Sequence, residues 1–255
     1  MKIYFDHVHG EQRDKDFIYS LISADFDHSE WNYAFENGWA PTHEFYLPNF
    51  PNKLVWYQSR QTRINIEDYS PSRKSKLLVR DTPVTWEIKE EVNDIHSIYE
   101  LYLQYCEYKG FSDVARYEYI KQYFTKSQPG YFIHFYLNNQ LIAITKISIW
   151  NASPFAEFFW WNYSDPSLSV GKLSSYIEIQ FVKKLHLSFL YLGLAYNSDS
   201  IYKSLKRGFQ WWTGRYWSNN IEEFRWLCEQ DDKIKTIDDL YTHQLTYLEK
   251  LKWHT

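Results

Sequence analysis

A short loop between a predicted strand and a predicted helix carries the residues best suited to bind an anion. The loop spans residues 164–172, SDPSLSVGK, and contains Ser169, Val170, Gly171 and Lys172. A helix that begins in this loop would direct free backbone N–H groups and the positive end of its dipole at a ligand. Gly171 would permit close approach of the backbone. The GxxxxGK spacing of a P-loop is absent, so the pattern indicates an anion site rather than an NTPase.

Carboxylates and hydroxyls on the neighbouring segments could serve acyl transfer. Aminolysis of an activated ester needs a positioned amine, a proton acceptor and a donor for the oxyanion. Glu157, on the strand before the loop, is the first candidate base; its alternative is a carboxylate satisfied by a nearby Lys or Tyr. Tyr191, Tyr196 and Tyr202 could donate to an oxyanion or simply pack. Glu178, within the helix, could recognise a cationic group or form an ordinary ion pair.

Hydrophobic patterning predicts the elements that hold these residues. Two strands flank Asn138-Asn139, a pair that tolerates positive φ and favours a tight hairpin. Residues 154–163 are nearly continuous in apolar side chains, which is typical of a central strand. A helix over 172–185 and a further buried strand over 188–194 complete the unit.

Residues 1–130 are predicted to contain helices and short strands. Helices are expected over 29–37, ended by Gly38, over 92–109, ended by Gly110, and from a Ser112/Asp113 cap onward. Short strands are expected at the following places: 3–8, 54–58, 62–66 and 84–88. In the C-terminal part, a cap at Ser198 or Asp199 and a capping box of Thr236 and Asp239 predict two further helices.

Bulk composition limits the classes of function. The chain has 255 residues, 44% of them hydrophobic and 20% aromatic, and a net charge of -4, so the molecule as a whole is not a polyanion binder. The two cysteines lie far apart, which predicts neither a zinc ribbon nor a disulfide scaffold. No apolar run approaches 18 residues. We therefore expect a cytoplasmic protein with no metal and no membrane partner.

The segment from Lys53 to Arg80 is locally basic. Seven basic and two acidic residues give it a charge of 7 − 2 = +5, and Trp56, Tyr57 and Tyr69 lie among them. This mixture suits phosphates together with exposed bases, whereas the plainer interpretation is a solvated basic face on an edge hairpin. We predict an N-terminal α+β part with this basic hairpin over residues 1–88 and a catalytic domain over 89–255.

The order of hairpin, strand, glycine loop, helix and strand is similar to that of the GNAT acyltransferase core. More specifically, FFWWNYSDPSLSVGKLSSYIEIQFVKKLHLSFLYLGLAYNSDSIYK resembles the C-terminal half of the arginyl-tRNA–protein transferases. The string SRQTRINIEDYSPSRKSKLLVRD resembles the end of their N-terminal region, and LYLQYCEYKGF the helix between the two halves. Together these strings cover roughly residues 30 to 210.

The resemblance implies an α+β or α/β fold, with a GNAT-like mixed sheet flanked by helices. It also implies an enzyme that moves an amino acid from aminoacyl-tRNA to a protein or peptide N-terminus or a small amine, with no further cofactor. The family's binding site for the tRNA 3′ end would correspond to Ser169, Val170, Gly171, Lys172, Glu178 and Lys203. Its basic element would correspond to Arg60, Arg63, Arg73, Lys74 and Lys76. Glu157, Tyr191 and Tyr202 are the catalytic candidates.

Two departures leave the donor amino acid and the acceptor open. No cysteine cluster occurs in the N-terminal region, and the family's element after Tyr-Leu-Gly is replaced by Asn197-Ser-Asp-Ser-Ile. The leucyl/phenylalanyl branch has Asp-x-Gln where this chain has Leu192 and Leu194, so that branch is a poorer match. The alternatives are a coenzyme A-dependent GNAT N-acyltransferase, although the usual second glycine is missing, and a non-catalytic tRNA-binding protein on the same fold.

Overall fold

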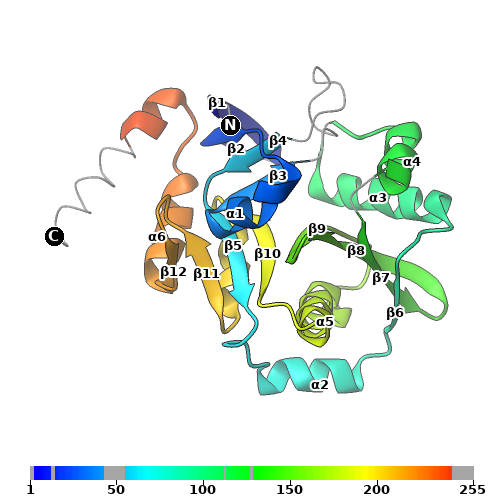
Figure 1. Cartoon of the computed structure of the whole chain (residues 1–255). Coiled ribbons are helices and arrows are strands. Elements are labelled where there is room, and N and C mark those ends of the chain that lie inside the picture. The colour runs from blue at the N-terminus through cyan, green and yellow to red at the C-terminus, as the bar shows by residue number, and fades with distance from the viewer. Residues whose placement is uncertain (1–2, 13–14, 43–54, 112, 127–128, 243–255) are drawn as a thin grey trace.

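The computed structural model describes residues 3–12, 15–42, 55–111, 113–126 and 129–242. A small antiparallel sheet in the order β1-β2-β4-β3 lies in the N-terminal region (Figure 1). Its strands are β1 (Ile3–Gln12), β2 (Lys15–Ala24), β3 (Trp39–Thr42) and β4 (Val55–Gln58). The turn η1 (His28–Glu30) and helix α1 (Trp31–Glu36) connect β2 to β3. Gly38 follows α1 with φ +72°, which confirms the predicted C-terminal glycine.

The second sheet has eight strands in the order β12-β11-β5-β10-β9-β8-β7-β6. They are β5 (Gln61–Asn65), β6 (Thr85–Lys89), β7 (Gly130–Leu137), β8 (Gln140–Trp150), β9 (Ser153–Trp161), β10 (Phe189–Leu194), β11 (Phe209–Trp212) and β12 (Trp217–Ser218). Neighbours are antiparallel except for β9 and β10, which are parallel. Asn138 and Asn139 have φ of 50° and 65°, so the predicted hairpin turn is confirmed.

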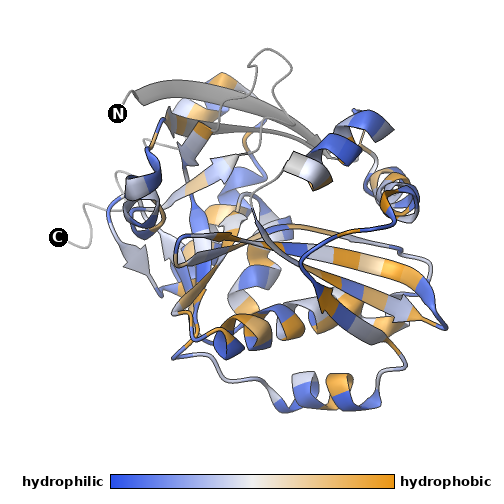
Figure 2. Ribbon diagram, turned by 45° about the vertical axis from the view of Figure 1, so that its right-hand side comes forward, coloured by the Kyte–Doolittle hydropathy of each residue, from blue (hydrophilic) through white to orange (hydrophobic). Residues whose placement is uncertain are grey.

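Helices cover both faces of the large sheet. They are α2 (Arg73–Asp81), α3 (Ile95–Lys109), α4 (Tyr117–Lys126), α5 (Val170–Lys184) and α6 (Ile221–Asp231), with the 3-10 segments η3 (Pro166–Leu168) and η4 (Ser198–Leu205). Figure 1 shows α5 against one face with α2 beyond it, and α3, α4 and the small sheet on the other. Apolar residues run along the long strands and α5 (Figure 2). The predicted mixed sheet flanked by helices, with a GNAT-like order of elements, is confirmed.

The described part of the chain holds no helix with the length and apolarity required to cross a bilayer.

Three local predictions are corrected by the structure. Helix α4 begins at Tyr117, because the N–H and carbonyl of Ala115 bond the hydroxyls of Tyr102 and Tyr99 on α3 instead of a helical turn. The segment after Asn197 forms the 3-10 helix η4 rather than an α-helix. No helix is predicted over residues 73–81, where the structure has α2 with Ser72 as its cap. The box of Thr236 and Asp239 forms as predicted.

The predicted basic hairpin does not form. Strand β4 pairs with β2 and β3 in the small sheet, whereas β5 pairs with β10 and β11 in the large one. Both β5 and β6 precede residue 89 and belong to the large sheet, so the predicted division at 88 does not coincide with the division between the sheets. Pairing with strands more than 100 residues away decides this, and local pattern carries no signal of it.

Acid should weaken the β6–β7 edge through His134. This side chain is 5% exposed and lies opposite Glu87 in the strand register. Burial and then the charge of Lys89 lower its pKa to about 4, with Glu87 opposing. The unfolded chain therefore binds a proton between pH 6.5 and 4 that the folded chain does not, and stability falls as pH falls through this window. The shift corresponds to roughly 3 kcal/mol of unfolding free energy.

Urea unfolding at several pH values between 7 and 4 will measure this effect. We expect the variant His134→Gln to show a flatter fall in unfolding free energy than the wild type across that window. Parallel curves for the two proteins would show that His134 does not contribute to the acid response.

Candidate active site where β9 and β10 meet

A bulge in each strand lies where the parallel strands β9 and β10 meet. On β9, Lys146 pairs with Phe158 and Ile147 with Ala156, which leaves Glu157 without a register partner on β8. On β10, the register against β5 shifts between Tyr191 and Gly193. Bulges bend a strand and re-aim its side chains, and are common beside active sites. The predicted base therefore lies at an irregular point in the middle of the sheet.

Glu157 forms a buried ion pair with Lys146. The Lys146 Nζ lies 2.8 Å from Glu157 Oε2, and the two side chains are 0% and 6% exposed. The rings of Tyr123 and Phe132 lie near the ammonium, at 5.0 and 5.7 Å from its nitrogen. Burial lowers the pKa of Lys146, and Glu157 opposes that shift. A carboxylate held in this way can exchange a proton with a neighbour or bind an ammonium group that enters the site.

Glu178 is a second buried carboxylate, on the other face of the sheet. Its Oε1 accepts a hydrogen bond of 2.6 Å from Ser174 Oγ, one turn earlier on α5. Burial raises its pKa, while Ser174, Thr145 and Lys206 lower it. Thr145 and Lys146 are consecutive on β8, so their side chains point to opposite faces. The two carboxylates thus approach the sheet from its two sides.

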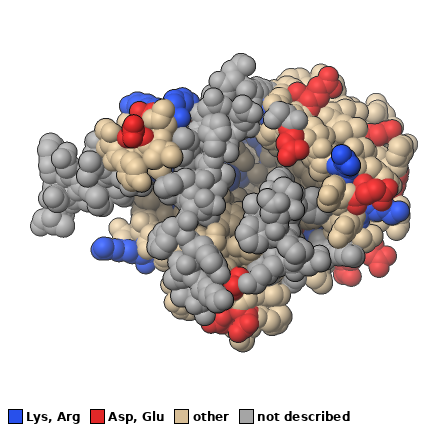
Figure 3. Space-filling model, turned by 90° about the horizontal axis from the view of Figure 1, so that it is seen from above, with Lys and Arg blue, Asp and Glu red and all other residues tan. Residues whose placement is uncertain are grey.

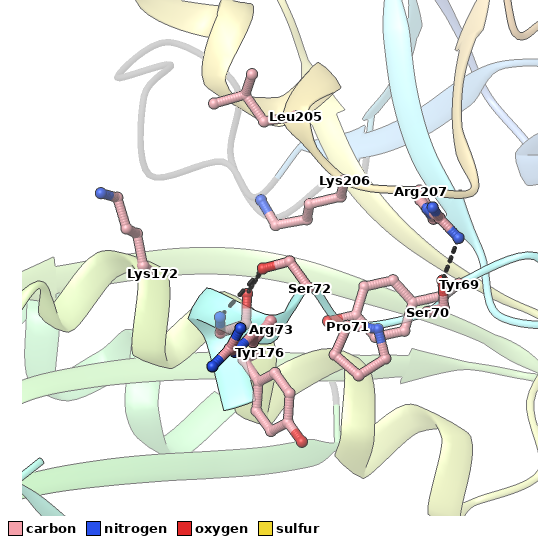
Figure 4. A pocket seen from close by; sticks show the side chains of 11 residues that line it. Tyr69, Ser70, Pro71, Ser72, Arg73, Lys172, Tyr176, Leu205, Lys206 and Arg207 are labelled. Carbon is pink, nitrogen blue, oxygen red and sulfur yellow. Dashed lines mark hydrogen bonds between the residues drawn. The ribbon is translucent and has the colours of Figure 1, made fainter. Parts of the chain in front are cut away.

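A basic pocket adjoins the Glu178 side. It encloses about 500 Å³ and is lined by Tyr69, Ser70, Pro71, Ser72, Arg73, Ser75, Lys172, Tyr176, Leu205, Lys206 and Arg207. Figure 4 shows the contributing segments: the start of α2, the first turns of α5 and the segment after η4. Four cationic side chains and no carboxylate are among these lining residues. Two helix N-termini add their dipoles, so the pocket suits a phosphate.

Three contacts organise the pocket walls. Ser72 Oγ accepts the Ser75 N–H at 3.1 Å and caps α2. Arg207 Nη1 donates to Ser70 Oγ at 3.1 Å. Burial lowers the pKa of Lys206, and the Glu178 carboxylate opposes the shift, which links the pocket to the buried acid. Lys206 and Arg207 are not among the predicted site residues, because the segment that carries them approaches α2 and α5 only in the folded chain.

Gly171 has a different role from the one predicted. A Cβ at this position would lie 1.9 Å from Cζ3 of Trp161, so the close approach that it permits is that of the indole ring at the end of β9. Ser169, with φ 50°, connects η3 to α5, and Val170 is buried. Lys172 is exposed and lines the pocket. The loop therefore supplies Lys172 and a helix start, while its glycine serves packing.

The predicted basic element is divided among three environments. Arg60 Nη1 lies 2.5 Å from Asp231 Oδ2 at the end of α6. Arg63 is stacked between the rings of Phe189 and Trp217, 3.8 and 4.0 Å from their centroids, and is 8% exposed. A side chain that contacts tRNA must be accessible to solvent, and neither of these two arginines is exposed.

The remaining members of that element lie on α2. Arg73 lines the pocket, and Lys74 and Lys76 are exposed on the same helix. On the face seen from above in Figure 3, basic and acidic side chains are interspersed among the described residues that are visible there. The pocket at α2 and α5 is therefore the stronger candidate for a phosphate contact.

Two further predicted residues, Tyr191 and Lys203, have structural partners. Tyr191 is 4% exposed and packs with Phe35 in the cluster beneath the small sheet; burial raises its pKa, and Arg63 lowers it. Lys203 Nζ donates to the carbonyls of Leu192 and Leu194 at 2.9 and 2.6 Å. Burial, and then Lys206, lower the pKa of Lys203 to about 8. Lys203 thus fastens η4 to the bulged strand β10.

Comparison with known proteins finds one matching family and several similar curated proteins. Residues 95–213 match the family described as arginine-tRNA-protein transferase, C terminus. The chain is 27% identical over 160 residues to an aspartate/glutamate leucyltransferase of Shewanella putrefaciens, which covers 61% of this chain and 68% of the relative. A Campylobacter jejuni protein of the same name is 26% identical over 163 residues, covering 57% and 67% of the two chains.

Solved structures that align with the chain include FemX and a lysylphosphatidylglycerol synthetase domain from Agrobacterium fabrum. FemX aligns with a TM-score of 0.44 and 6% identity over 76% of this chain and 80% of its own. The synthetase domain aligns with a TM-score of 0.42 and 12% identity over 66% and 51%. Residues 95–213 therefore match the C-terminal part of the arginine-tRNA-protein transferases, and the similarity to curated leucyltransferases supports an aminoacyltransferase.

Proposed function

We propose that the protein transfers an amino acid from the 3′ end of charged tRNA to the α-amino group of a peptide. Leucine is the first donor to consider and an N-terminal Asp or Glu the first acceptor, since the relatives are named for that reaction. Arginine is the second donor, because the matching family model is named for it. Aminoacyl-tRNA would be the co-substrate, with no other cofactor.

The basic pocket is the observation that carries this proposal. A tRNA end presents phosphates on a flexible single strand, and four cations at two helix starts suit such a group. The pocket lies beside Glu178, and α5 begins immediately after the segment that follows β9. A phosphate held there would place the terminal ribose and its ester toward the junction of β9 and β10.

The chemistry requires little beyond positioning. The amine nitrogen attacks the ester carbonyl, a C–N bond forms, and the C–O bond to the ribose breaks. We assign Glu157 as the group that takes the ammonium proton, directly or through water. Its side chain lies on the face of the sheet opposite the pocket. Protonated Glu157 then returns this proton to the departing ribose oxygen, directly or through water, so the products are an amide and a tRNA end with a free hydroxyl. Tyr202, beside Glu178, is the candidate donor to the oxyanion.

A coenzyme A-dependent N-acyltransferase is the second candidate function, because the same pocket would suit a pyrophosphate. The two functions differ in a simple measurement. Acetyl-coenzyme A at millimolar concentration should leave the melting temperature unchanged if tRNA is the donor, and should raise it if coenzyme A is.

A transfer assay with charged tRNA tests the main proposal. Labelled leucyl-tRNA and arginyl-tRNA are incubated separately with peptides that differ only in an N-terminal Asp, Glu, Lys or Ala. We expect labelled peptide that disappears after ribonuclease treatment of the donor, and mass spectrometry of the product will identify the added residue. Absence of transfer across a complete set of charged tRNAs and these acceptors would refute the proposal.

A further inference from the structure

Two large apolar side chains are exposed on η4 beside the basic pocket. Tyr202 is 56% exposed and Leu205 is 70% exposed, although both belong to residue types that proteins tend to bury. They are three residues apart on a 3-10 helix, in which side chains at i and i+3 are eclipsed. They therefore form one ridge, which we call the Tyr202–Leu205 ridge. Leu205 itself lines the pocket.

A charged group accompanies the ridge. Lys206 Nζ lies 5.6 Å from the centroid of the Tyr202 ring and also lines the pocket. Burial and the nearby Glu178 carboxylate raise the pKa of the Tyr202 hydroxyl to about 12, and the residue is 56% exposed. An exposed ring next to a basic pocket is the combination that binds single-stranded nucleic acid through stacking and charge.

The ridge is held from below by β10 and α6. Lys203, between the two ridge residues, donates to two β10 carbonyls, as described above. Ser204 Oγ accepts from Arg225 Nε of α6 at 3.2 Å and donates to the Ile201 carbonyl at 2.7 Å. These contacts fix η4 from within the segment. A platform that is already ordered loses little conformational entropy when a base binds.

The start of η4 is held just as firmly. Asp231 Oδ2 accepts the N–H of Asn197 and Asp232 Oδ1 that of Ser198, both at 3.2 Å. Asn197 has φ 54° and ψ 172°, a conformation that is rare outside glycine and persists only where neighbours impose it. Strained residues of this kind concentrate at binding sites. The end of α6 thus holds η4 in place, with the Tyr202–Leu205 ridge beside the pocket.

We propose that the Tyr202–Leu205 ridge is the platform on which the terminal base of the donor tRNA stacks while its phosphate occupies the basic pocket. This inference rests on the proposed function and adds the recognition of the unpaired 3′-terminal nucleotide. The pocket favours this occupant over an apolar side chain, because the four surrounding cations match a phosphodiester and a peptide side chain would leave them without a counter-charge. Tyr202 would then contribute by its ring as well as by its hydroxyl.

An RNA binding experiment with two matched probes tests the platform. The probes are an uncharged acceptor-stem minihelix ending in CCA, with 2-aminopurine as its last base, and the same minihelix without the last nucleotide. For the wild type we expect quenching of the 2-aminopurine and a Kd about tenfold lower for the complete probe, the order of magnitude of one stacked base.

Variants locate the effect. We expect Tyr202→Ala to lose the quenching and to bind the complete probe about tenfold more weakly, with unchanged affinity for the truncated one. Tyr202→Phe should retain both properties because it keeps the ring. Tyr119→Ala is the matched control, since Tyr119 is 57% exposed on α4, which packs on the other face of the sheet.

The outcomes separate the platform from the function. If Tyr202→Ala weakens both probes equally or neither of them, while the wild type still transfers an amino acid from tRNA, the platform is wrong and the proposed function stands. If the wild type neither binds the complete probe nor transfers, both are overturned.

Discussion

Replacing Glu157 by Gln should reduce kcat of transfer by about 100-fold or more, the usual contribution of a general base. The amide keeps the size of the carboxylate but cannot accept the ammonium proton at neutral pH. The KM for charged tRNA should change little, because the donor pocket lies on the opposite face of the sheet. Single-turnover transfer at saturating donor will measure the rate of the chemical step.

The ion pair between Glu157 and Lys146 means that this variant also affects stability. The same pair offers a control, because both charges can be removed together. Glu157→Gln leaves the Lys146 ammonium buried beside an uncharged group, which costs stability. The double variant Lys146→Gln/Glu157→Gln removes both charges and should recover most of the melting temperature but none of the activity. If the double variant recovers transfer, Glu157 serves only to balance Lys146. Glu87→Gln is a control variant, because Glu87 forms an ion pair with Lys89 on the edge strand β6. It should leave kcat unaffected.

Reversing charge in the basic pocket should have the second large effect. In the variant Arg73→Glu/Lys172→Glu, two exposed pocket cations become anions. We expect affinity for tRNA to fall by about 30-fold or more at low salt. The slope of log Kd against log salt should decrease by roughly 1.5, because two phosphate contacts of a single strand are lost. Filter binding at four or more salt concentrations gives both quantities.

A control variant with the same change in net charge is available on α5, the helix that carries Lys172. Lys183 and Lys184 are exposed in the last turn of α5, remote from its start. We expect Lys183→Glu/Lys184→Glu to reduce affinity only slightly and to leave the salt slope near that of the wild type. Equal losses in the two double variants would indicate a diffuse electrostatic attraction, and the pocket would then not be the phosphate site.

Local patterns in the sequence determined the elements of the catalytic half. Asn138-Asn139 specified the hairpin because both residues tolerate positive φ, and Gly110 ended α3 for the same reason. The continuous apolar run of β9 indicated a strand covered on both faces, and the structure places it between β8 and β10. The ordered resemblance indicated the same family whose model matches residues 95–213, since its motifs lie within contiguous stretches of chain.

Tertiary structure decided which charges are available for binding. Arg60 and Arg63 belong to the same basic segment as Arg73, yet only Arg73 lines the pocket. The first two lie at or next to β5 in the large sheet. There Arg60 forms an ion pair with Asp231, and Arg63 packs on the ring of Trp217. A charge run in a sequence does not reveal its partners when those partners lie about 150 or more residues away.

The same distinction applies to the loop at the start of α5. Its position between a strand and a helix was evident from the sequence, and so was a lysine able to bind an anion. That Gly171 accommodates Trp161, and that Lys206 and Arg207 complete the pocket, depended on how β9 and η4 pack around α5. Close packing fixes such contacts through side-chain shape and volume, which no local pattern of residue types encodes.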